Sequence, residues 1–280
     1  MWPDTSRKDT MKIVSFNING IRARIHQLEA LKDHLNPDVI GLQEVKVADE
    51  HFPYRDLEFL NYRFDTHGQK GHYGVALASK PEPLNITRGY ITDSADAQRR
   101  MIRGVYSLAD GTEVTILNGY FPQGEARDHP VKFPAKAAFY SDLLNTLNKE
   151  YSPADHIIVM GDFNVAPLDQ DIGITADAKK RWLRTGKSSF LPEEREWFQA
   201  LTNWGLTDSW RSVNPDTSDR YSWFDYRSRG FEDDPKRGLR IDHILVSQPL
   251  LVRMDDCGID YTLRAMEKPS DHCPVWISIK

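Results

Sequence analysis

The chain has few cysteines and no long apolar run. Its 280 residues include only Cys257 and Cys273, which excludes a disulfide framework and is typical of a reducing compartment; a single bridge between them is left open. No apolar run reaches the length of a membrane span, so we expect no membrane partner and a cytoplasmic, intracellular location. Residues 1–10 are polar and lack the apolar core of a secretory signal, and we interpret them as a loose extension before one domain over residues 11–280.

The chain also lacks an excess of positive charge. It has 36 Lys and Arg against 41 Asp and Glu, a net charge of −5, which weighs mildly against a nucleic-acid partner. Basic residues nevertheless gather near 99–103, 179–187 and 227–229. Each group alone is more often a solvated surface than a binding site, so the charge pattern by itself names no partner.

Apolar patterns along the chain predict an α/β fold without repeats or linkers. Strand-like runs occur near 12–17, 38–43, 73–79, 113–120, 156–161, 241–247 and 273–279. Apolar residues at helical spacing are Leu28, Leu31 and Leu35; Phe139, Leu143 and Leu147; and Trp197, Leu201 and Trp204. Asp110-Gly111 predicts a hairpin turn. Strands and helices alternate early while hairpins intrude in the middle, so we expect mixed sheets covered by helices.

Five short segments, far apart in the chain, carry carboxylate, amide or imidazole side chains, and several directly follow a predicted strand. They are Asn17 after 12–16, Glu44 after 39–42, Asp162 and Asn164 after 156–160, Asp242 in 240–243, and Asp271 with His272 in 269–272. Ligands of α/β proteins collect where strands end, so we expect these side chains in one cleft. Hard oxygen donors suit Mg²⁺ or Mn²⁺, whereas a donor set with a single His argues against zinc.

Such a cluster predicts a metal site that breaks phosphate esters, since a divalent cation offsets the charge of a phosphodiester and of the leaving oxygen. We predict Glu44 as the first ligand, with Asn17 and Asp271 in direct or water-mediated contact. Asp162 would hold or deprotonate the attacking water and Asn164 would orient it, both near the metal. In an extended backbone these two side chains would lie on one side. Taken singly, Glu44 could equally be an acidic residue at the surface. Asp162 and Asn164 could equally form an Asx turn that ends a strand.

An imidazole and a phenol complete the predicted chemistry. His272 would contact the phosphate through one ring nitrogen while Asp242 holds the other nitrogen and favours the imidazolium. Tyr120 would donate a hydrogen bond to the phosphate or the leaving oxygen. A single His or Tyr is more often structural, so these roles rest on the joint presence of all the segments.

In this order the segments resemble the exonuclease III type of abasic-site endonuclease, within the endonuclease/exonuclease/phosphatase superfamily. The resemblance runs from Met11 to nearly the end of the chain and includes the stretches 67–76, 118–125, 181–187 and 222–228. It implies a four-layered sandwich, in which two mixed β-sheets pack face to face between helices. It also implies that residues 11–280 form a single catalytic domain.

The activity that the resemblance implies is Mg²⁺-dependent incision of duplex DNA on the 5′ side of an abasic site, with Mn²⁺ as a substitute metal. Such relatives also remove nucleotides from 3′ ends and clear blocked 3′ termini, and we expect a monomer acting on double-stranded DNA. The matching positions place Glu44 at the metal, Asp162 and Asn164 at the water, and His272 with Asp242 at the phosphate. Further matches are Asn17, Tyr120 and Asp271 in the pocket, Trp223, Phe224 and Leu239 in its wall, Arg100 as a residue that enters the duplex, and Gln123 and Lys132 beside the DNA backbone.

An apolar wall would accept a flipped-out sugar without its base and resist one that carries a base. Without the other motifs, Trp223-Phe224 would be ordinary core. A phosphatase or lipid phosphodiesterase with the same core gives no reason for Arg100 or for this wall. A DNA-binding module without catalysis, or a plain scaffold, gives no reason for the complete set of acids and the His. Two segments depart from the resemblance, the additional residues 1–10 and a lengthened stretch at 233–236.

Overall fold

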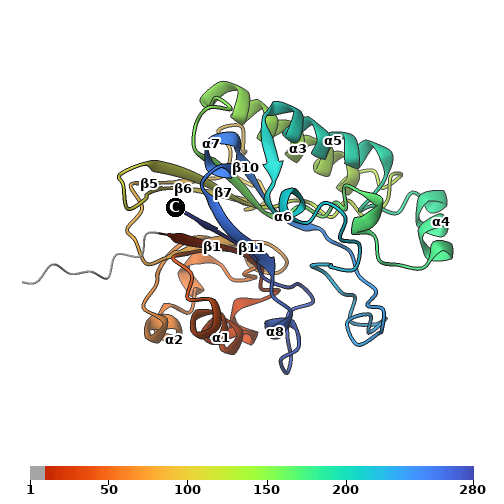
Figure 1. Ribbon diagram of the computed structural model, residues 1–280, viewed down its shortest axis with the longest axis horizontal. Helices are drawn as coiled ribbons and strands as arrows, with labels where there is room; N and C mark the ends of the chain where they lie inside the picture. The colour runs from red at the N-terminus through yellow and green to blue at the C-terminus, as the bar shows by residue number, and fades with distance from the viewer. Residues whose placement is uncertain (1–9) are drawn as a thin grey trace, which may run out of the picture.

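The computed structural model describes residues 10–280, and these residues form two six-stranded β-sheets that pack face to face (Figure 1). Helices cover the outer face of each sheet, so the predicted four-layered α/β sandwich is confirmed. The predicted extension lies outside the described residues except for Thr10. Both cysteines are free, and no helix in the described part of the chain is long and apolar enough to span a membrane.

The first sheet brings Asn17 and Glu44 to the same end of its two central strands. In spatial order it contains β11 (Met254–Ile259), β12 (Val275–Ile279), β1 (Met11–Asn17), β2 (Val39–Gln43), β4 (Val75–Ser79) and β3 (Arg63–His67). Only β1 and β2 run parallel among these neighbours. Their register pairs Asn17 with Gln43, so Glu44 follows at the same end of the sheet as Asn17.

The second sheet aligns three predicted site residues in one row. In spatial order it contains β5 (Asn85–Arg88), β6 (Met101–Ser107), β7 (Glu113–Tyr120), β8 (Ile157–Asp162), β10 (Asp242–Ser247) and β9 (Leu206–Asp208). The parallel pair β7–β8 sets Tyr120 beside Asp162, and the antiparallel pair β8–β10 sets Asp242 on the other side of Asp162. A close approach of β7 and β8 requires Gly161, where an added Cβ would fall 1.8 Å from the carbonyl oxygen of Gly119.

Helices complete the outer layers. The first sheet is covered by α1 (Ile25–Leu35), α2 (Tyr54–Leu57) and α8 (Tyr261–Arg264), and the second by α3 (Lys132–Glu150) and α5 (Pro192–Trp204) (Figure 1). The short α7 (Gln248–Leu251) follows β10, and its Leu250 packs into the layer between the sheets. The short α6 (Ser209–Val213) follows β9, and four 3₁₀ turns are Ile21–Ala23, Asp49–His51, Glu58–Leu60 and Asp169–Asp171. Helix α4 (Ala176–Thr185) projects at one end of the sandwich (Figure 1).

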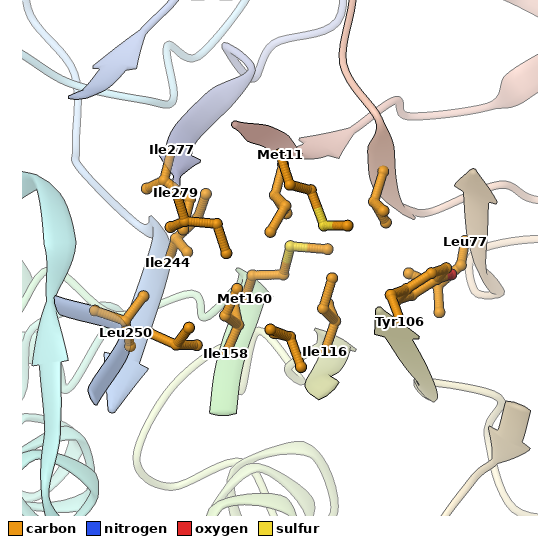
Figure 2. Close-up of a cluster of buried hydrophobic side chains, with 14 of the residues drawn as sticks. Met11, Leu77, Tyr106, Ile116, Ile158, Met160, Ile244, Leu250, Ile277 and Ile279 are labelled. Carbon is orange, nitrogen blue, oxygen red and sulfur yellow. The ribbon is translucent and has the colours of Figure 1, made fainter. Parts of the chain in front are cut away.

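Three apolar layers hold the sandwich together. Between the sheets, side chains of both sheets point toward one another, among them Met11, Leu77, Ile116, Met160, Ile244 and Ile277 (Figure 2). Alternate residues of the same strands face outward: Val14 and Phe16 pack with Leu28 of α1, and Val159 packs with Leu143 of α3. This period-two alternation with both faces buried is why the central strands read as continuous apolar runs.

The predicted elements are confirmed where an apolar pattern was strong, and the missed ones lack such a pattern. The turn at Asp110-Gly111 joins the antiparallel strands β6 and β7, and Gly111 has the positive φ of 86° that this turn needs. The predicted strand near 73–79 begins two residues later, after Gly74 at a φ of 94°. The missed strands β3, β5, β9 and β11 all lie at sheet edges, β5 and β11 are mostly solvent-accessible, and the missed helix α4 has no buried residue.

A buried charge network fixes the start of β10, directly before Asp242. Arg240 is 1% exposed, and its guanidinium donates to Asp171 Oδ1 at 2.7 Å and to Asp208 Oδ2 at 2.7 Å. Burial alone would raise the pKa of Asp208, but Arg240 and His243 outweigh burial and lower this pKa below its usual range. The network therefore links β9, β10 and the 3₁₀ turn at Asp169–Asp171 beneath the catalytic edge of the sheet.

We predict that Asp208→Asn lowers the free energy of unfolding by about 3 kcal/mol at neutral pH, because it removes one partner of a buried ion pair. Asp208 binds its proton less readily in the folded than in the unfolded chain. Its stabilising contribution is thus present above the usual pKa of 3.8 and is lost as pH falls below that value. Urea unfolding from neutral pH to about pH 3 should show a flatter acid decline for the variant than for wild type. The exposed Asp33→Asn serves as the control, and equal acid declines in all three proteins would contradict the assignment.

Candidate active site

Residues from both sheets meet in a cleft of about 570 Å³ at the end of the sandwich. Of the predicted site residues, the cleft is lined by Glu44, Tyr120, Gln123, Asp162, Asn164, Trp223, Leu239, Asp271 and His272. Asn17 and Asp242 lie directly behind this surface, 0% and 2% exposed, and bond to lining residues. Five segments that are distant in the sequence are therefore brought together as predicted.

The centre of the cleft is a cluster of acidic oxygens able to hold a metal ion. One ligand atom each of Glu44, Asp162 and His272 lies within 4.8 Å of the others. Asn17 Nδ2 donates to Glu44 Oε1 at 3.0 Å and to Asp162 Oδ2 at 2.9 Å, which joins a carboxylate of each sheet. The amide oxygen of Asn17 accepts from the backbone N–H of Asn19, so Asn17 presents its NH₂ to the cluster and holds the carboxylates rather than offering a free oxygen ligand.

Burial and like charge set the protonation of the cluster. Burial raises the pKa of Asp162, and the nearby carboxylates of Asp242 and Glu44 raise it further, against the opposing charge of His272. Lys46 Nζ lies 3.0 Å from Glu44 Oε2 and supplies a positive charge at the rim. Two or more carboxylates converging on one point are the donor set of a hard divalent cation, because such a cation relieves their repulsion. The residues present thus fit a metal of the Mg²⁺ or Mn²⁺ type.

His272 is held by Asp242 as the sequence predicts. Its Nδ1 lies 3.0 Å and 2.9 Å from the two carboxylate oxygens of Asp242, and its Nε2 lies 3.7 Å from Asp162 Oδ2. Burial alone would lower the pKa of His272, but the charges of Asp242 and Asp162 outweigh burial and raise it. Ser222 Oγ accepts from the Asp242 N–H at 2.9 Å and so fixes the partner. The imidazolium therefore directs an Nε2–H into the cleft at neutral pH.

Asp162 and Asn164 both line the cleft, but by a different backbone geometry from the one predicted. The extended backbone is wrong, because β8 ends at Asp162 and Asn164 has a left-handed φ of 53°. Asp162 Oδ1 accepts from the Asn164 N–H at 3.0 Å, which is the Asx turn considered as the alternative. Asn164 Nδ2 donates to the carbonyl oxygen of Phe121 at 3.0 Å. The Asx turn is therefore part of the site, since it places the side chains of Asp162 and Asn164 in the cleft lining.

Tyr120 lines the cleft, and Arg100 supports it from behind. Burial raises the pKa of Tyr120 well above its usual value, so the phenol keeps its proton and acts as a donor. Arg100 is only 8% exposed; its Cζ lies 4.5 Å and 4.7 Å from the ring centroids of Tyr73 and Tyr120, and its Nη1 donates to the Tyr120 carbonyl oxygen at 3.0 Å. In this arrangement the guanidinium is stacked and bonded within the protein, not extended toward a duplex as the resemblance implies.

The apolar wall consists of Trp223, Leu239 and Ile241, all of which line the cleft. Phe224 is 0% exposed and packs edge-on against Tyr221, so it forms core behind the wall and not the wall itself. Ile241 was missed although the alternation Leu239-Arg240-Ile241 signals it, because residues two apart share a face. Trp223 pairs with Leu239 through two backbone hydrogen bonds, of 2.9 and 3.0 Å, that fix the wall.

The wall and the acidic cluster share one hydrogen bond. Trp223 Nε1 donates to Asp271 Oδ2 at 3.0 Å, and Asn19 Nδ2 donates to Asp271 Oδ1 at 2.8 Å. Burial alone would raise the pKa of Asp271, but the charge of His272 and these two bonds lower it, so the group stays ionised. The indole that shapes the wall therefore also positions the carboxylate of Asp271, which lines the cleft beside His272.

Basic residues surround the mouth of the cleft. Arg181, Lys187, Arg227 and Arg237 line it, and Trp182 stands among them. Arg181, Lys187 and Arg227 belong to basic groups that the sequence left as solvated surface, Arg237 belongs to none of them, and only the fold brings the four to one opening. Gln123 lines the cleft as predicted, whereas Lys132 is exposed, outside the cleft lining, and paired with Glu125 at 2.5 Å.

Similarity to known proteins agrees with this geometry. Residues 14–272 match the Endonuclease/Exonuclease/phosphatase family. The chain belongs to this family. The chain is 59% identical to exodeoxyribonuclease III of Haemophilus influenzae over 96% of its own length and 100% of that protein.

Solved structures of this family share the fold. The 3′ phosphatase NExo from Neisseria, solved with a product DNA hairpin, is 35% identical, with a TM-score of 0.85 over 96% of this chain and 99% of that one. An AP endonuclease from Archaeoglobus fulgidus is 32% identical, with a TM-score of 0.86 over 96% and 99%. The family relation thus extends over nearly the whole length of both chains.

We predict that Asp242→Asn moves the titration of His272 to lower pH, because it removes the charge that raises the imidazole pKa. Nuclear magnetic resonance of the imidazole in metal-free protein would measure this midpoint. Asp110→Asn, an exposed carboxylate in the β6–β7 turn, is the matched control and should leave the midpoint unchanged. An identical midpoint in wild type and Asp242→Asn would mean that Asp242 does not determine the charge of His272.

Proposed function

We propose that this protein is a DNA repair nuclease of the exodeoxyribonuclease III type. It hydrolyses the backbone of duplex DNA on the 5′ side of abasic sites and removes nucleotides or blocking groups from 3′ ends. The observation that carries the proposal is one cleft that combines the acidic cluster, the His272–Asp242 pair, an apolar wall and a basic mouth. Residues 11–280 act as a single catalytic domain, as a monomer, in the cytoplasm where the DNA is.

The metal of the reaction is Mg²⁺, with Mn²⁺ as a substitute. Glu44 and Asp162 would hold it with carboxylate oxygens, Asn164 and Asp271 would complete its surroundings directly or through water, and Asn17 would keep the carboxylates in place. Bound there, the ion offsets the charge of the phosphate and of the leaving oxygen. Carboxylate and amide oxygens are the ligands that Mg²⁺ prefers, which supports this choice of metal.

The side chains divide the hydrolysis among them. Asp162 takes a proton from the water that Asn164 orients, and the water oxygen bonds to phosphorus as the bond from phosphorus to the 3′ oxygen breaks. His272 donates a hydrogen bond from Nε2–H to a phosphate oxygen, and the phenol of Tyr120 donates a hydrogen bond to the departing 3′ oxygen. That oxygen takes a proton from solvent and leaves as a hydroxyl.

Selectivity for a missing base comes from the apolar wall. Trp223, Leu239 and Ile241 surround space for an extruded sugar, and a sugar that still carries its base meets this wall. Extruding a normal nucleotide also requires a few kcal/mol of unstacking, which an abasic nucleotide avoids. The basic mouth with Arg181 and Lys187 holds the flanking phosphates, so an acidic protein can still bind DNA.

We predict that Asp162→Asn lowers the rate of abasic-site cleavage by about 10²–10⁴-fold, since it removes the group that accepts the proton. The variant should fold, because it removes a charge whose burial is unfavourable. Single-turnover cleavage of an abasic duplex and its intact twin, with Mg²⁺ and with chelator, measures the effect. Near wild-type cleavage by the variant would contradict the role of Asp162. Absence of Mg²⁺-dependent cleavage by wild type would contradict the proposed function.

Two substitutions separate the two roles of the wall. Leu239→Ala opens the pocket without touching Asp271, so we predict a reduced preference for abasic over intact DNA at nearly unchanged turnover. Trp223→Phe keeps an aromatic wall but removes the N–H that bonds Asp271, so we predict a retained preference and about tenfold slower turnover, as expected for one hydrogen bond to a charged group. Competition between abasic and intact duplexes, together with kcat, measures both effects. Identical behaviour of the two variants would mean that wall and carboxylate are not separable in this way.

A further inference from the structure

The ion pair between Lys136 and Glu194 lies wholly inside the protein, next to the cleft but not in it. Both side chains are 0% exposed, and Nζ and Oε1 are 2.5 Å apart. Lys136 stands near the start of α3 and Glu194 in the first turn of α5. Removing two charges from water costs as much as such a pair returns, so stability alone gives no reason for it here.

Lys136 also bonds two segments that reach the cleft. Its Nζ donates to the carbonyl oxygen of Asn164 at 2.8 Å and to that of Gln123 at 3.3 Å. One helical turn further along α3, the hydroxyl of Tyr140 donates to the carbonyl oxygen of Phe163 at 2.8 Å. Helix α3 thus holds two consecutive carbonyl groups of the turn that carries Asn164.

Glu194 bonds a third segment. Its Oε2 accepts from the backbone N–H groups of Ser189 and Leu191, both at 2.8 Å. Ser188 joins this segment to the first one, because its hydroxyl donates to the Gln123 carbonyl oxygen at 2.7 Å. The pair and its partners therefore connect the segments 121–125, 162–165 and 187–191.

All three segments carry unfavourable backbone geometry and a cleft residue. Glu125, Asn164 and Ser189 have φ values of 62°, 53° and 119°, a region that residues other than glycine rarely adopt. Such residues persist only where the surroundings over-determine them, and they concentrate at functional sites. Gln123, Asn164 and Ser189 line the cleft, so the strained segments are also the ones whose position matters.

We propose that Lys136 and Glu194 are positioning residues, a three-segment clamp that fixes Gln123, Asn164 and Ser189 relative to one another around the substrate. The pair touches neither the acidic cluster nor the cleft, and acts through the carbonyl oxygens and N–H groups it bonds. Its catalytic consequence rests on the proposed function, whereas the fixed geometry of the three segments does not. Both charged groups take part, because the ammonium of Lys136 binds two carbonyl groups and the carboxylate of Glu194 binds two N–H groups.

The test uses the full chain and the double variant Lys136→Met/Glu194→Gln, which removes both charges and leaves none unpaired in the interior. The matched control is Arg127→Met/Glu193→Gln, which removes a neighbouring, partly exposed ion pair between the loop before α3 and the first turn of α5. Circular dichroism and thermal unfolding identify the folded variants. Amide hydrogen exchange without substrate reports on the three segments, and multiple-turnover cleavage of an abasic duplex at saturating Mg²⁺ gives kcat and KM separately.

If the clamp exists, backbone amides of the double variant should exchange faster than those of wild type in 121–125, 162–165 and 187–191. Amides in the centres of α3 and α5 should stay protected from exchange. The clamp also predicts that kcat falls by about 10- to 100-fold with a smaller change in KM, since a small displacement of a catalytic group has effects of this size. The control should match wild type in both measurements.

Wild-type kcat in the folded double variant, or an equal loss in the control, would overturn the proposal. If the double variant does not fold, Lys136→Arg is measured instead, because this variant keeps the charge but changes the directions of the hydrogen-bond donors. Wild-type kcat and wild-type exchange in Lys136→Arg would overturn the proposal. A selective loss of kcat would support the proposal. If wild type cleaves no abasic DNA, the proposed function fails, and the exchange measurement alone decides the clamp.

Discussion

The repulsion among buried carboxylates is the constraint on which the site depends. Asp162 and Asp242 are almost fully buried, at 1% and 2% exposure, and Glu44 joins them at the cleft surface. Like charges in a medium of low dielectric disfavour ionisation, so each carboxylate needs a compensating group. Asn17 bridges two of them with its NH₂, and His272 stands between Asp162 and Asp242 as a cation. A divalent metal is the further compensation that this arrangement calls for.

Strand register sets the first part of this concentration of charge. In the parallel pair β1–β2, Asn17 ends β1 and Glu44 follows β2 at the same end, while register across β7, β8 and β10 aligns Tyr120, Asp162 and Asp242. Face-to-face packing of the sheets then brings the two ends together, with an apolar layer behind them (Figure 2). The core is therefore what forces the carboxylates into contact, since the strands cannot separate without opening that layer.

The parts of the site that follow directly from strand ends could be predicted, and the parts that depend on long-range packing could not. Asn17, Glu44 and Asp162 each follow an apolar run, so their convergence is readable from the sequence. The left-handed turn at Asn164 depends on bonds from α3, which no local pattern contains. Likewise Arg100 resembles a residue that enters DNA, but stacking between Tyr73 and Tyr120 holds it inside the protein.

The composition of the cleft wall could likewise be predicted only in part from the sequence. Trp223 and Phe224 are adjacent aromatics, and their order in the chain does not say which one faces the cleft. Opposite orientation of neighbouring residues sends Trp223 into the cleft and Phe224 into the core, while the alternation at 239–241 adds Ile241 to the wall. Buried charges such as Lys136 and Glu194 are also invisible as a pair, because nothing local distinguishes them from the exposed Lys and Glu beside them.

Recognition and chemistry are coupled in this structure because they share supporting groups. The indole of Trp223 belongs to the wall and bonds Asp271, which adjoins His272 in the chain. Lys136 likewise holds the carbonyl groups of Gln123 and of Asn164, both of which line the cleft. Under the proposed function, a substrate that displaces Trp223 would therefore also displace Asp271. Fit of the sugar and alignment of the water would then be linked through Trp223 and Lys136, whereas Leu239 and Ile241 belong to the wall alone.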